Sequence, residues 1–391
     1  MMTFLKNLAD ELTTAPGIYS IIVSAAGIGF VFGGMLPLIS LWLESLGLGF
    51  NAIGLVSGIS ALGIVVSAYF APFFARRFGI VKTVVIGLGS TAIMTVAFRL
   101  VDGFSLWLLT RFLSGLGLGL HWVLSEAWLA KIVSDKGRTR AMALYATALS
   151  LGFALGPMVI LGFGFLTPLP FYVSSLLVLL AAVPMIGLRN HEPKMSVKKM
   201  GSPLMLIRFT PTIATACMVA GAVDLALISL LPALVARMPD AVPSLAIFLV
   251  PAMGLGNVVL QYPIATLADK YGLRLVSVII ASTGIIFCSL IPFFLWSFAG
   301  ALALTFFGAG LVYGLYTIAL AMVSKRFSTG EIVAANAGFV ILFEFANLVG
   351  PTLAGAMIDY NMRFGLPVFM MSVGIIYAVI SYIRRGADNP G

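Results

Sequence analysis

The sequence predicts an all-α integral membrane protein with twelve transmembrane helices, arranged as two pseudo-symmetric six-helix halves around a central cavity. Three observations predict this class. Hydrophobic residues make up 61% of the 391 residues and charged residues only 9%, so lipid must be the main solvent of the chain. The apolar segments run for about 20 residues, which is the length that a helix needs to cross about 30 Å of hydrocarbon. The third observation is an internal repeat.

The predicted spans are continuously apolar, whereas the strands of a membrane barrel would alternate apolar and polar residues. A polar stretch at 188–208 divides them into an N-terminal half, 1–187, and a C-terminal half, 209–391, and we expect this stretch to be a cytoplasmic linker. The spans fall near residues 16–43, 51–75, 80–101, 105–131, 138–162, 167–187, 209–236, 243–268, 275–297, 299–324, 331–357 and 364–383.

Three pairs of short motifs recur at an offset of about 193 residues. Repeated halves of this kind build the central site of many secondary transporters, which opens to either side of the membrane in turn. The pairs are Arg76-Arg77-Phe78-Gly79 with Asp269-Lys270-Tyr271-Gly272, Gly115-Leu116-Gly117 with Gly308-Ala309-Gly310, and Gly156-Pro157 with Gly350-Pro351.

The net charge of +9 is distributed as in a membrane protein. Most Lys and Arg residues fall on one side of the predicted spans, and only Arg99, Arg237 and Arg363 fall on the other. The positive-inside rule then places both termini and the linker in the cytoplasm of a bacterial-type inner membrane. The basic excess can contact anionic lipid head groups, and nothing in it suggests nucleic acid. The stretch 1–15 lacks the order of regions that defines a cleavable signal.

Catalytic chemistry is not predicted. Cys217 and Cys288 fall inside apolar spans, so we expect free, buried thiols. No zinc spacing, nucleotide-binding glycine loop or hydrolase elbow occurs in a suitable context. We therefore expect no enzymatic activity, no metal site and no cofactor.

The loops after spans two and eight resemble those of the major facilitator superfamily, in which a pattern like G-x-x-x-D-R-x-G-R is found. The second copy is the better match, with Asp269, Lys270, Gly272 and Arg274 in place. In the first copy Arg76 takes the position of the acid, ahead of Arg77 and Gly79. The resemblance implies that this acid pairs across a helix junction and steadies the outward-facing state. With Arg76 there, we expect a rewired or weaker latch in the first half.

Two further motifs extend the resemblance over essentially the whole chain. Arg111 to Gly115 in span four is similar to the family motif R-x-x-x-G, which is linked to proton coupling. Gly152 to Pro157, with Gly156, is similar to the G-x-x-x-G-P motif of proton-coupled exporters. The same glycine spacing also serves plain helix packing, and a proline loosens any helix, so both interpretations of this motif stay open.

Ionisable residues inside spans are costly, at least about 2.5 kcal/mol each, and persist mainly where they face a cavity or a partner. At about 100° per residue, the polar residues of span four fall within roughly 140° of one face, so we expect this face to line the cavity. They are Arg111, Ser114, His121, Trp122, Ser125 and Glu126.

Four residues are candidates for proton coupling. Asp224 lies near the middle of span seven and is the first candidate; a permanent ion pair with Arg111 or a structural hydrogen bond is the alternative. Glu126 could be a proton exit group or part of an inner-gate salt bridge. His121 could shuttle protons or satisfy a local hydrogen bond. Glu344 could act in transport or, with nearby Asn side chains, clamp two helices.

Polar and aromatic residues elsewhere complete the predicted cavity. Trp122 in span four, together with Tyr313, Tyr316 and Thr317 in span ten, would form an aromatic wall with polar tips, suited to planar or amphipathic solutes. Asn257 and Gln261 stand one turn apart in span eight. They could bind substrate or merely tie helices together.

The sequence thus favours a secondary active transporter that works by alternating access. Proton-coupled export (antiport) of a small organic or amphipathic molecule is the first hypothesis, and proton-coupled uptake (symport) of a sugar, organic acid or other metabolite is the second. A sensor or scaffold that does not transport is the alternative from another class. Expected partners are the solute, protons and membrane lipid, and one chain already contains both halves, so it can work as a monomer.

Overall fold

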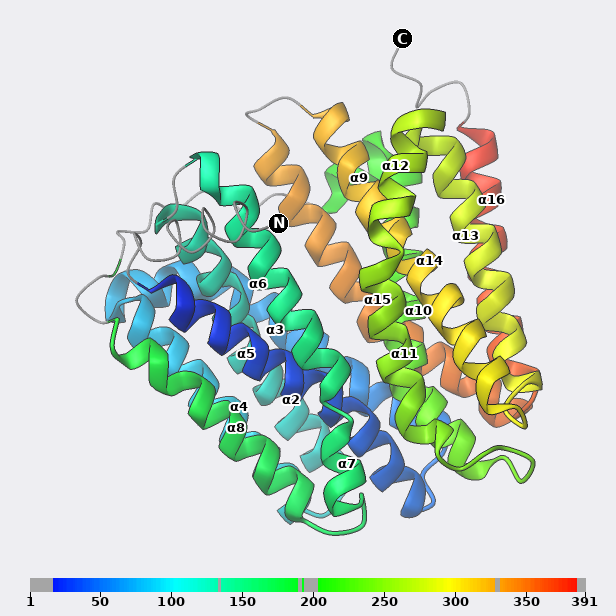
Figure 1. Ribbon diagram of the computed structural model, residues 1–391, viewed down its shortest axis with the longest axis horizontal. Helices are drawn as coiled ribbons and strands as arrows, with labels where there is room; N and C mark the ends of the chain where they lie inside the picture. Colours follow the sequence, from blue (N-terminus) through cyan, green and yellow to red (C-terminus); the bar gives the residue numbers. More distant parts are fainter. Residues whose placement is uncertain (1–16, 133–134, 189–191, 193–202, 328–330, 385–391) are drawn as a thin grey trace, which may run out of the picture. The chain divides into compact units, whose positions relative to one another are not determined.

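The computed structural model describes residues 17–132, 135–188, 192, 203–327 and 331–384, and within them it is built of α-helices without strands (Figure 1). The stretch 1–16 and most of the predicted linker lie outside the described residues. The chain divides into two compact units. Met1–Met35 and Gly63–Val197 form the first, and Leu36–Leu62 and Lys198–Gly391 form the second. The second unit therefore includes a piece of the N-terminal half.

The helices of the N-terminal half follow one another with short connections. They are α2 (Ile18–Ser45), α3 (Phe50–Phe78), α4 (Ile80–Leu100), α5 (Phe104–Ile132), α6 (Asp135–Leu155), α7 (Met158–Phe163) and α8 (Leu169–Ile186). The end of α2 and the beginning of α3 belong to the second unit.

The C-terminal half supplies the rest of the second unit. Its helices are α9 (Pro203–Phe209), α10 (Pro211–Arg237), α11 (Leu245–Val259), α12 (Gln261–Tyr271), α13 (Leu273–Leu290), the short 3-10 helix η2 (Ile291–Phe293), α14 (Phe298–Arg326), α15 (Ile332–Tyr360) and α16 (Gly365–Ile383).

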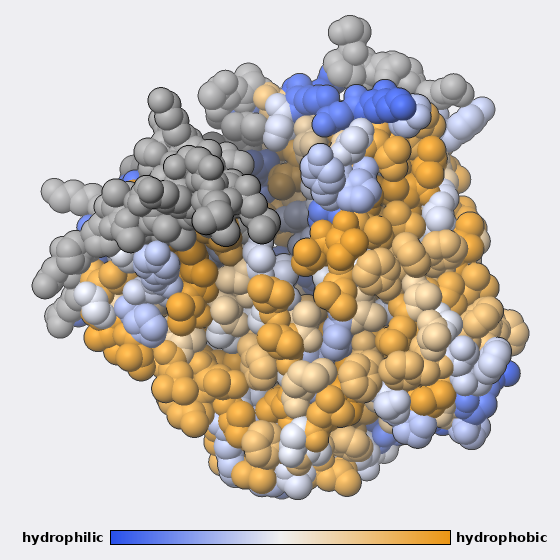
Figure 2. All heavy atoms as spheres, viewed as in Figure 1, coloured by the Kyte–Doolittle hydropathy of each residue, from blue (hydrophilic) through white to orange (hydrophobic). Residues whose placement is uncertain are grey.

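These helices confirm the predicted membrane fold. Within the described ranges, ten helices are long and apolar enough to cross a membrane, or eleven when α11 and α12, which meet at 41°, count as one bent span. The remaining predicted span is α5. It is 29 residues long, but it is less apolar because it carries Arg111, His121 and Glu126. In Figure 2, hydrophobic residues cover most of the length of the second-unit helices and hydrophilic residues gather at their ends. Such a surface suits contact with lipid.

The internal repeat is visible in how helices cross. A Cβ atom on Gly63 of α3 would lie 2.3 Å from the carbonyl oxygen of Phe112 on α5. A Cβ atom on Gly256 of α11 would lie 2.1 Å from that of Phe306 on α14. Helix backbones touch at both crossings, and only glycine leaves room for this. The two halves thus use the same contact at equivalent positions.

The repeated loop motif also has a structural reason. Gly79, between α3 and α4, has φ of 89°, and Gly272, between α12 and α13, has φ of 91°. Residues with a Cβ atom are strained in this region, so glycine is required at both turns. Next to them, the Arg77 guanidinium lies 5.9 Å from the Phe78 ring centroid, and the equivalent Lys270 ammonium lies 5.1 Å from that of Tyr271.

The Gly-Pro motif behaves differently in the two halves. In the first, α6 ends at Leu155 and α7 begins just after Pro157, so the helix is interrupted at this motif. In the second, Pro351 lies inside an unbroken α15. Gly152 and Gly156 both pack against α2, because Cβ atoms there would lie 2.1 and 2.3 Å from backbone oxygens of that helix. A packing role for the glycines is thereby supported.

Candidate functional site

The polar face predicted on α5 is buried in the first unit. Arg111, Ser114, His121 and Ser125 expose 5%, 4%, 1% and 0% of their surface. A helix that met only lipid would have no reason to hide these side chains. The structure therefore brings these four candidates together on the interior side of α5.

His121 is held by α2. Its Nε2 atom shares a hydrogen bond of 2.7 Å with the hydroxyl oxygen of Ser24. Its Nδ1 atom is buried and has no hydrogen-bond partner among the described residues. The ring is thus positioned through one nitrogen, while the other is available for a proton or a ligand.

Glu126 lies one helical turn beyond Trp122. The Trp122 indole Nε1 donates a hydrogen bond of 2.7 Å to the Glu126 Oε1 atom. Tyr145, a buried residue of α6, is close enough to Glu126 to interact with its charge. The polar edge of Trp122 is therefore directed to a carboxylate. Residues four apart face the same side of a helix, so the contact between Trp122 and Glu126 could have been predicted from their spacing in the sequence.

Asp224 lies within α10 in the second unit, between the buried residues Val223 and Leu225. No described group of this unit hydrogen-bonds to it or forms an ion pair with it. Two ionisable groups of the same unit, the Cys288 thiol on α13 and the Glu344 carboxyl on α15, lie within electrostatic range of Asp224. Cys217 and Cys288 are both free and buried, as predicted.

Glu344 belongs to a polar group at the contact of α10 with α15. The side-chain amide of Asn347 donates a hydrogen bond of 3.2 Å to the Glu344 Oε2 atom. The Asn347 oxygen lies 3.3 Å from where a Cβ atom of Gly221 on α10 would stand. Among the described residues, the side-chain oxygens of Asn336 and Asn347 are buried without a hydrogen-bond donor. This placement fits the predicted helix clamp, and a transport role for Glu344 stays a prediction.

Tyr313 and Tyr316, two residues of the predicted aromatic wall, lie on α14 beside aromatic residues of α15. The rings of Tyr313 and Tyr316 stack with centroids 5.7 Å apart. Tyr316 also meets Phe339 and Phe343 of α15 edge to face, at centroid distances of 5.1 and 4.9 Å. Tyr316 is therefore held in place by its neighbours and presents a defined surface.

Gln261 stands at the break between α11 and α12. The Thr317 hydroxyl on α14 donates a hydrogen bond of 2.7 Å to the Gln261 Oε1 atom, so Gln261 does tie helices together. Its amide nitrogen and the side-chain oxygen of Asn257 are buried and have no partner among the described residues. A donor and an acceptor are thus left one turn apart on this segment.

The charged motif residues occupy the helix ends. Arg76 and Arg77 end α3, and Asp269 and Lys270 lie near the end of α12. Arg274, at the start of α13, donates hydrogen bonds to the carbonyl oxygens of Ser381 and Arg384 at the end of α16. It therefore joins the beginning of one helix to the end of another.

Glu192, which the sequence did not single out, makes the corresponding link in the first unit. Its carboxylate accepts hydrogen bonds from the backbone N–H groups of Ile80, at 2.8 Å, and Val81, at 3.3 Å. These are the first residues of α4, and a carboxylate is favourable there because helix N-termini carry unpaired donors and a partial positive charge. The link lies beside Gly79, at the turn where Arg76 replaces the expected acid.

Comparison with known proteins agrees with this architecture. Residues 21–250, more than half of the chain, match the family model described as the Major Facilitator Superfamily. The chain belongs to the major facilitator superfamily. The resemblance found in the sequence is confirmed, and the protein is a multi-pass membrane protein of a transporter family.

Relatives among curated proteins cover most of the chain. The uncharacterized MFS-type transporter YfkF of Bacillus subtilis is 28% identical over 346 residues, which are 84% of this chain and 85% of YfkF. The uncharacterized MFS-type transporter YcaD of Salmonella enteritidis is 24% identical over 355 residues, 90% of this chain and 91% of YcaD.

Solved structures share the fold. A mutant of the nucleoside transporter NupG aligns with a TM-score of 0.80 and 13% identity, over 95% of this chain and 99% of NupG. A bacterial homolog of the human lysosomal transporter Spinster aligns with a TM-score of 0.75 and 14% identity, over 96% and 98%. At these identities the likeness concerns the fold alone.

Proposed function

We propose that this protein is a secondary active transporter that exports a small organic or amphipathic molecule in exchange for protons. The proposal places it in a bacterial-type cytoplasmic membrane with both termini inside, because most basic residues lie on that side of the predicted spans. Arg237 and Arg363, at the ends of α10 and α15, then lie on the outer face. Alternating access would come from movement of residues 1–187 against 209–391, and a monomer suffices.

The environment of Asp224 is the observation that carries the proton coupling. Asp224 is half-buried among apolar residues of α10, where an ionised carboxylate is favoured by a counter-ion or hydrogen bonds, and neither is found among the described residues of its unit. Binding of a proton removes the charge. Coupling then requires that the inward-facing and outward-facing states bind the proton and the solute with different free energies. Asp224 is our proton carrier for this reason.

The other acidic and basic candidates assist this step. His121 keeps one ring nitrogen available, and Glu126 is held by Trp122, so the pair can pass a proton along α5. Glu344 lies within electrostatic range of Asp224, so protonation of Asp224 would be transmitted through it to α15. These roles are part of the proposal.

Each unit carries candidate residues for contact with the solute. Stacked Tyr313 and Tyr316 suit a planar or amphipathic solute, because aromatic faces favour contact with flat apolar groups. Neighbouring polar groups would fix the orientation of the solute through hydrogen bonds or charge. They are Arg111, Ser114, Trp122, Ser125, Asn257, Gln261 and Thr317.

Flux into proteoliposomes tests the proposal. A panel of labelled organic solutes would be offered with and without an imposed pH gradient, to the parent and to Asp224→Asn. Asp240→Asn, which changes an exposed acid of the same half, is the matched control. We expect gradient-driven flux in the parent and the control and its loss in Asp224→Asn.

The direction of flux separates the hypotheses. Solute movement opposite to the protons supports export, and movement with the protons supports the uptake alternative. Equal gradient-driven flux in Asp224→Asn and the parent would contradict the role of Asp224. No flux of any solute, by a monodisperse and correctly inserted protein, would favour the sensor or scaffold alternative.

A further inference from the structure

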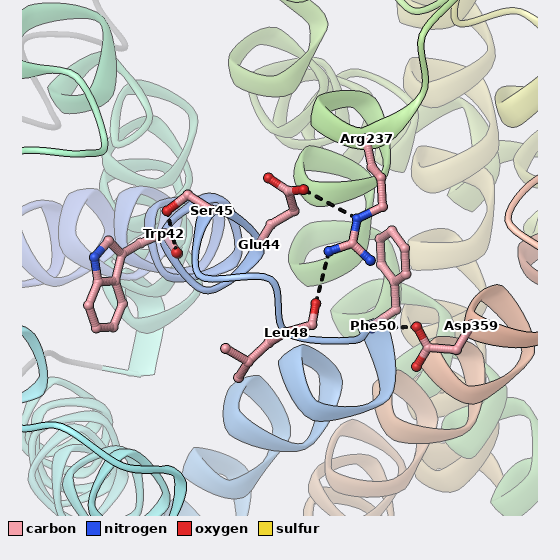
Figure 3. A network of polar contacts seen from close by, with 7 residues as sticks. All are labelled: Trp42, Glu44, Ser45, Leu48, Phe50, Arg237 and Asp359. Atoms are coloured by element: carbon pink, nitrogen blue, oxygen red, sulfur yellow. Dashed lines mark hydrogen bonds and ion pairs between the residues drawn. The ribbon is translucent and has the colours of Figure 1, made fainter.

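The turn between α2 and α3 is fastened to helices of the C-terminal half by side chains that the functional proposal does not use (Figure 3). All of them belong to the second compact unit, in which residues 36–62 of the N-terminal half pack with the C-terminal half. We name this network the outer clasp. It consists of Glu44, Leu48, Phe50, Asn51, Arg237, Thr352 and Asp359.

Arg237, the last residue of α10, makes three contacts across the clasp. Its Nε atom donates a hydrogen bond of 3.2 Å to the Glu44 carboxylate, and its Nη2 atom donates one of 2.9 Å to the Leu48 carbonyl oxygen. Its guanidinium carbon lies 4.7 Å from the centroid of the Phe50 ring. A planar guanidinium can satisfy a carboxylate, a carbonyl and an aromatic face together, which a lysine cannot.

Asp359 holds the beginning of α3 from the end of α15. Its two carboxylate oxygens accept hydrogen bonds from the backbone N–H groups of Phe50, at 2.7 Å, and Asn51, at 2.8 Å. The first turn of α3 has no acidic residue of its own. Two of the unpaired N–H groups at this helix start are thus satisfied by a charge from the other half of the chain. The Asn51 amide adds a hydrogen bond of 3.0 Å to the Thr352 carbonyl oxygen.

Backbone contact continues the seam from the clasp along α3 and α15. A Cβ atom on Gly54 would lie 2.2 Å from the Pro351 carbonyl oxygen, and one on Gly355 would lie 2.2 Å from that of Phe50. No side chain fits between the helices at these points. The polar contacts therefore close an already tight seam, and they are lost together when the helices separate.

We infer that the outer clasp is a latch that keeps the outer ends of α2 and α3 closed against the C-terminal half, and that Asp359 is its principal residue. The inference rests on the proposed function, since only a transporter needs this seam to open in each cycle. Asp359 has this role because it supplies a full charge to the start of α3, whose first turn has no acidic residue of its own. When the latch opens, the N–H groups of Phe50 and Asn51 and the carboxylate of Asp359 form hydrogen bonds to water in place of those to one another. The closed state is therefore favoured only moderately, and the latch can open.

The C-terminal half offers a matched control on the same face. Asp240 and Arg363 form an exposed ion pair between the loop after α10 and the loop after α15. Both partners belong to the C-terminal half, so this pair does not bridge the seam. Loss of Asp240 therefore changes charge on the same face without touching the latch.

Distances between spin labels test the latch. Labels would be placed on Leu46→Cys, in the α2–α3 turn, and Ser244→Cys, at the start of α11; both positions are exposed. Native Cys217 and Cys288 are fully buried and should stay unlabelled. Pulsed electron paramagnetic resonance would compare the parent, Asp359→Asn and Asp240→Asn without solute or gradient.

We expect Asp359→Asn to raise the ratio of long to short distances about tenfold, because it removes the negative charge and replaces one of the two acceptor oxygens by a donor. Asp240→Asn should leave the distribution unchanged. An unchanged distribution in Asp359→Asn, or an equal shift in both variants, would overturn the inference.

A second variant tests the latch if the first does not fold. If Asp359→Asn does not give monodisperse protein, Asn51→Ala, which loses the bond to Thr352, should shift the distribution in the same direction by roughly threefold; no shift would overturn the latch. Because the distances are measured without transport, a shift in a protein that moves no solute would support the latch and contradict the proposed function. Solute flux together with unshifted distances would support the proposed function and contradict the latch.

Discussion

Alanine at the two equivalent helix crossings should destabilise the protein. Gly63→Ala would place a Cβ atom 2.3 Å from the Phe112 carbonyl oxygen, and Gly256→Ala one 2.1 Å from that of Phe306. Favourable carbon contacts begin at about 3.5 Å, so each new methyl group is more than about 1 Å too close. The obstructing atoms are backbone, which cannot rotate away as a side chain can.

The size of the effect follows from what must move. The helices have to separate or bend by about 1 Å, and overpacking of this kind typically costs about 1–3 kcal/mol. Gly89→Ala in α4 is the matched control, since nothing lies within 4 Å of its added Cβ atom. That substitution should be neutral or stabilise by up to about 1 kcal/mol, because alanine is the better helix former.

Thermal unfolding in detergent, followed by the monodisperse fraction on size-exclusion chromatography, measures these effects. We expect Gly63→Ala and Gly256→Ala to lower the midpoint by similar amounts of several degrees and Gly89→Ala to leave it unchanged or raise it. If either crossing variant were as stable as the parent, that crossing would not be the close backbone contact described above. A large effect at one crossing and none at the other would refute their equivalence.

Three further substitutions probe individual contacts. Ser24→Ala removes the hydroxyl that pairs with His121 and leaves a buried ring nitrogen unpaired; unfolding should become easier by about 1–3 kcal/mol, and an unchanged midpoint would show that the pair contributes nothing. Trp122→Phe keeps the aromatic bulk but removes the N–H that donates to Glu126, so the pH dependence of gradient-driven flux should shift; an unaltered pH profile would exclude Glu126 from the proton path. Glu192→Ala removes the acceptor at the start of α4 and should destabilise this helix end by about 0.5–2 kcal/mol. Amide hydrogen exchange in the first turn of α4 should then be severalfold faster, and equal exchange rates in the parent and the variant would contradict the cap.

The fold was predictable because lipid imposes a simple rule on the sequence. A span must be apolar for about 20 residues, and the predicted spans end within a few residues of the observed helices. The predicted span 243–268 is the main departure, since it is divided into α11 and α12 at Leu260. Pro263 gives the physical reason for the break, because it has no N–H for the carbonyl oxygen of Val259, four residues earlier, and its ring crowds that oxygen.

Local spacing predicted part of the candidate site. The face of α5 that carries Arg111 and His121 is buried as its periodicity indicated. The hydrogen bond from Trp122 to Glu126 could also be predicted from the sequence, because residues four apart lie together on a helix. The stacking of Tyr313 on Tyr316 follows from a spacing of three.

Contacts between distant segments were not predictable. Glu192 reaches an N-terminus 112 residues earlier in the chain, and Asp359 reaches one 309 residues earlier. Exposed acids after helix ends are common, and only the packing of helices shows which of them caps a neighbour. The Gly-Pro motif gives the same lesson, since Pro157 divides its span whereas Pro351 does not.

Proton release on solute binding tests whether Asp224 carries the coupled proton. Purified protein in weakly buffered detergent, with a pH-sensitive dye, would be mixed with a solute identified in the flux panel. In an antiporter whose carrier is Asp224, solute and proton compete, so we expect the parent to release up to about one proton per molecule and Asp224→Asn to release none while still binding solute. Equal proton release by the parent and Asp224→Asn would contradict the account, because the coupled proton would then reside on another group.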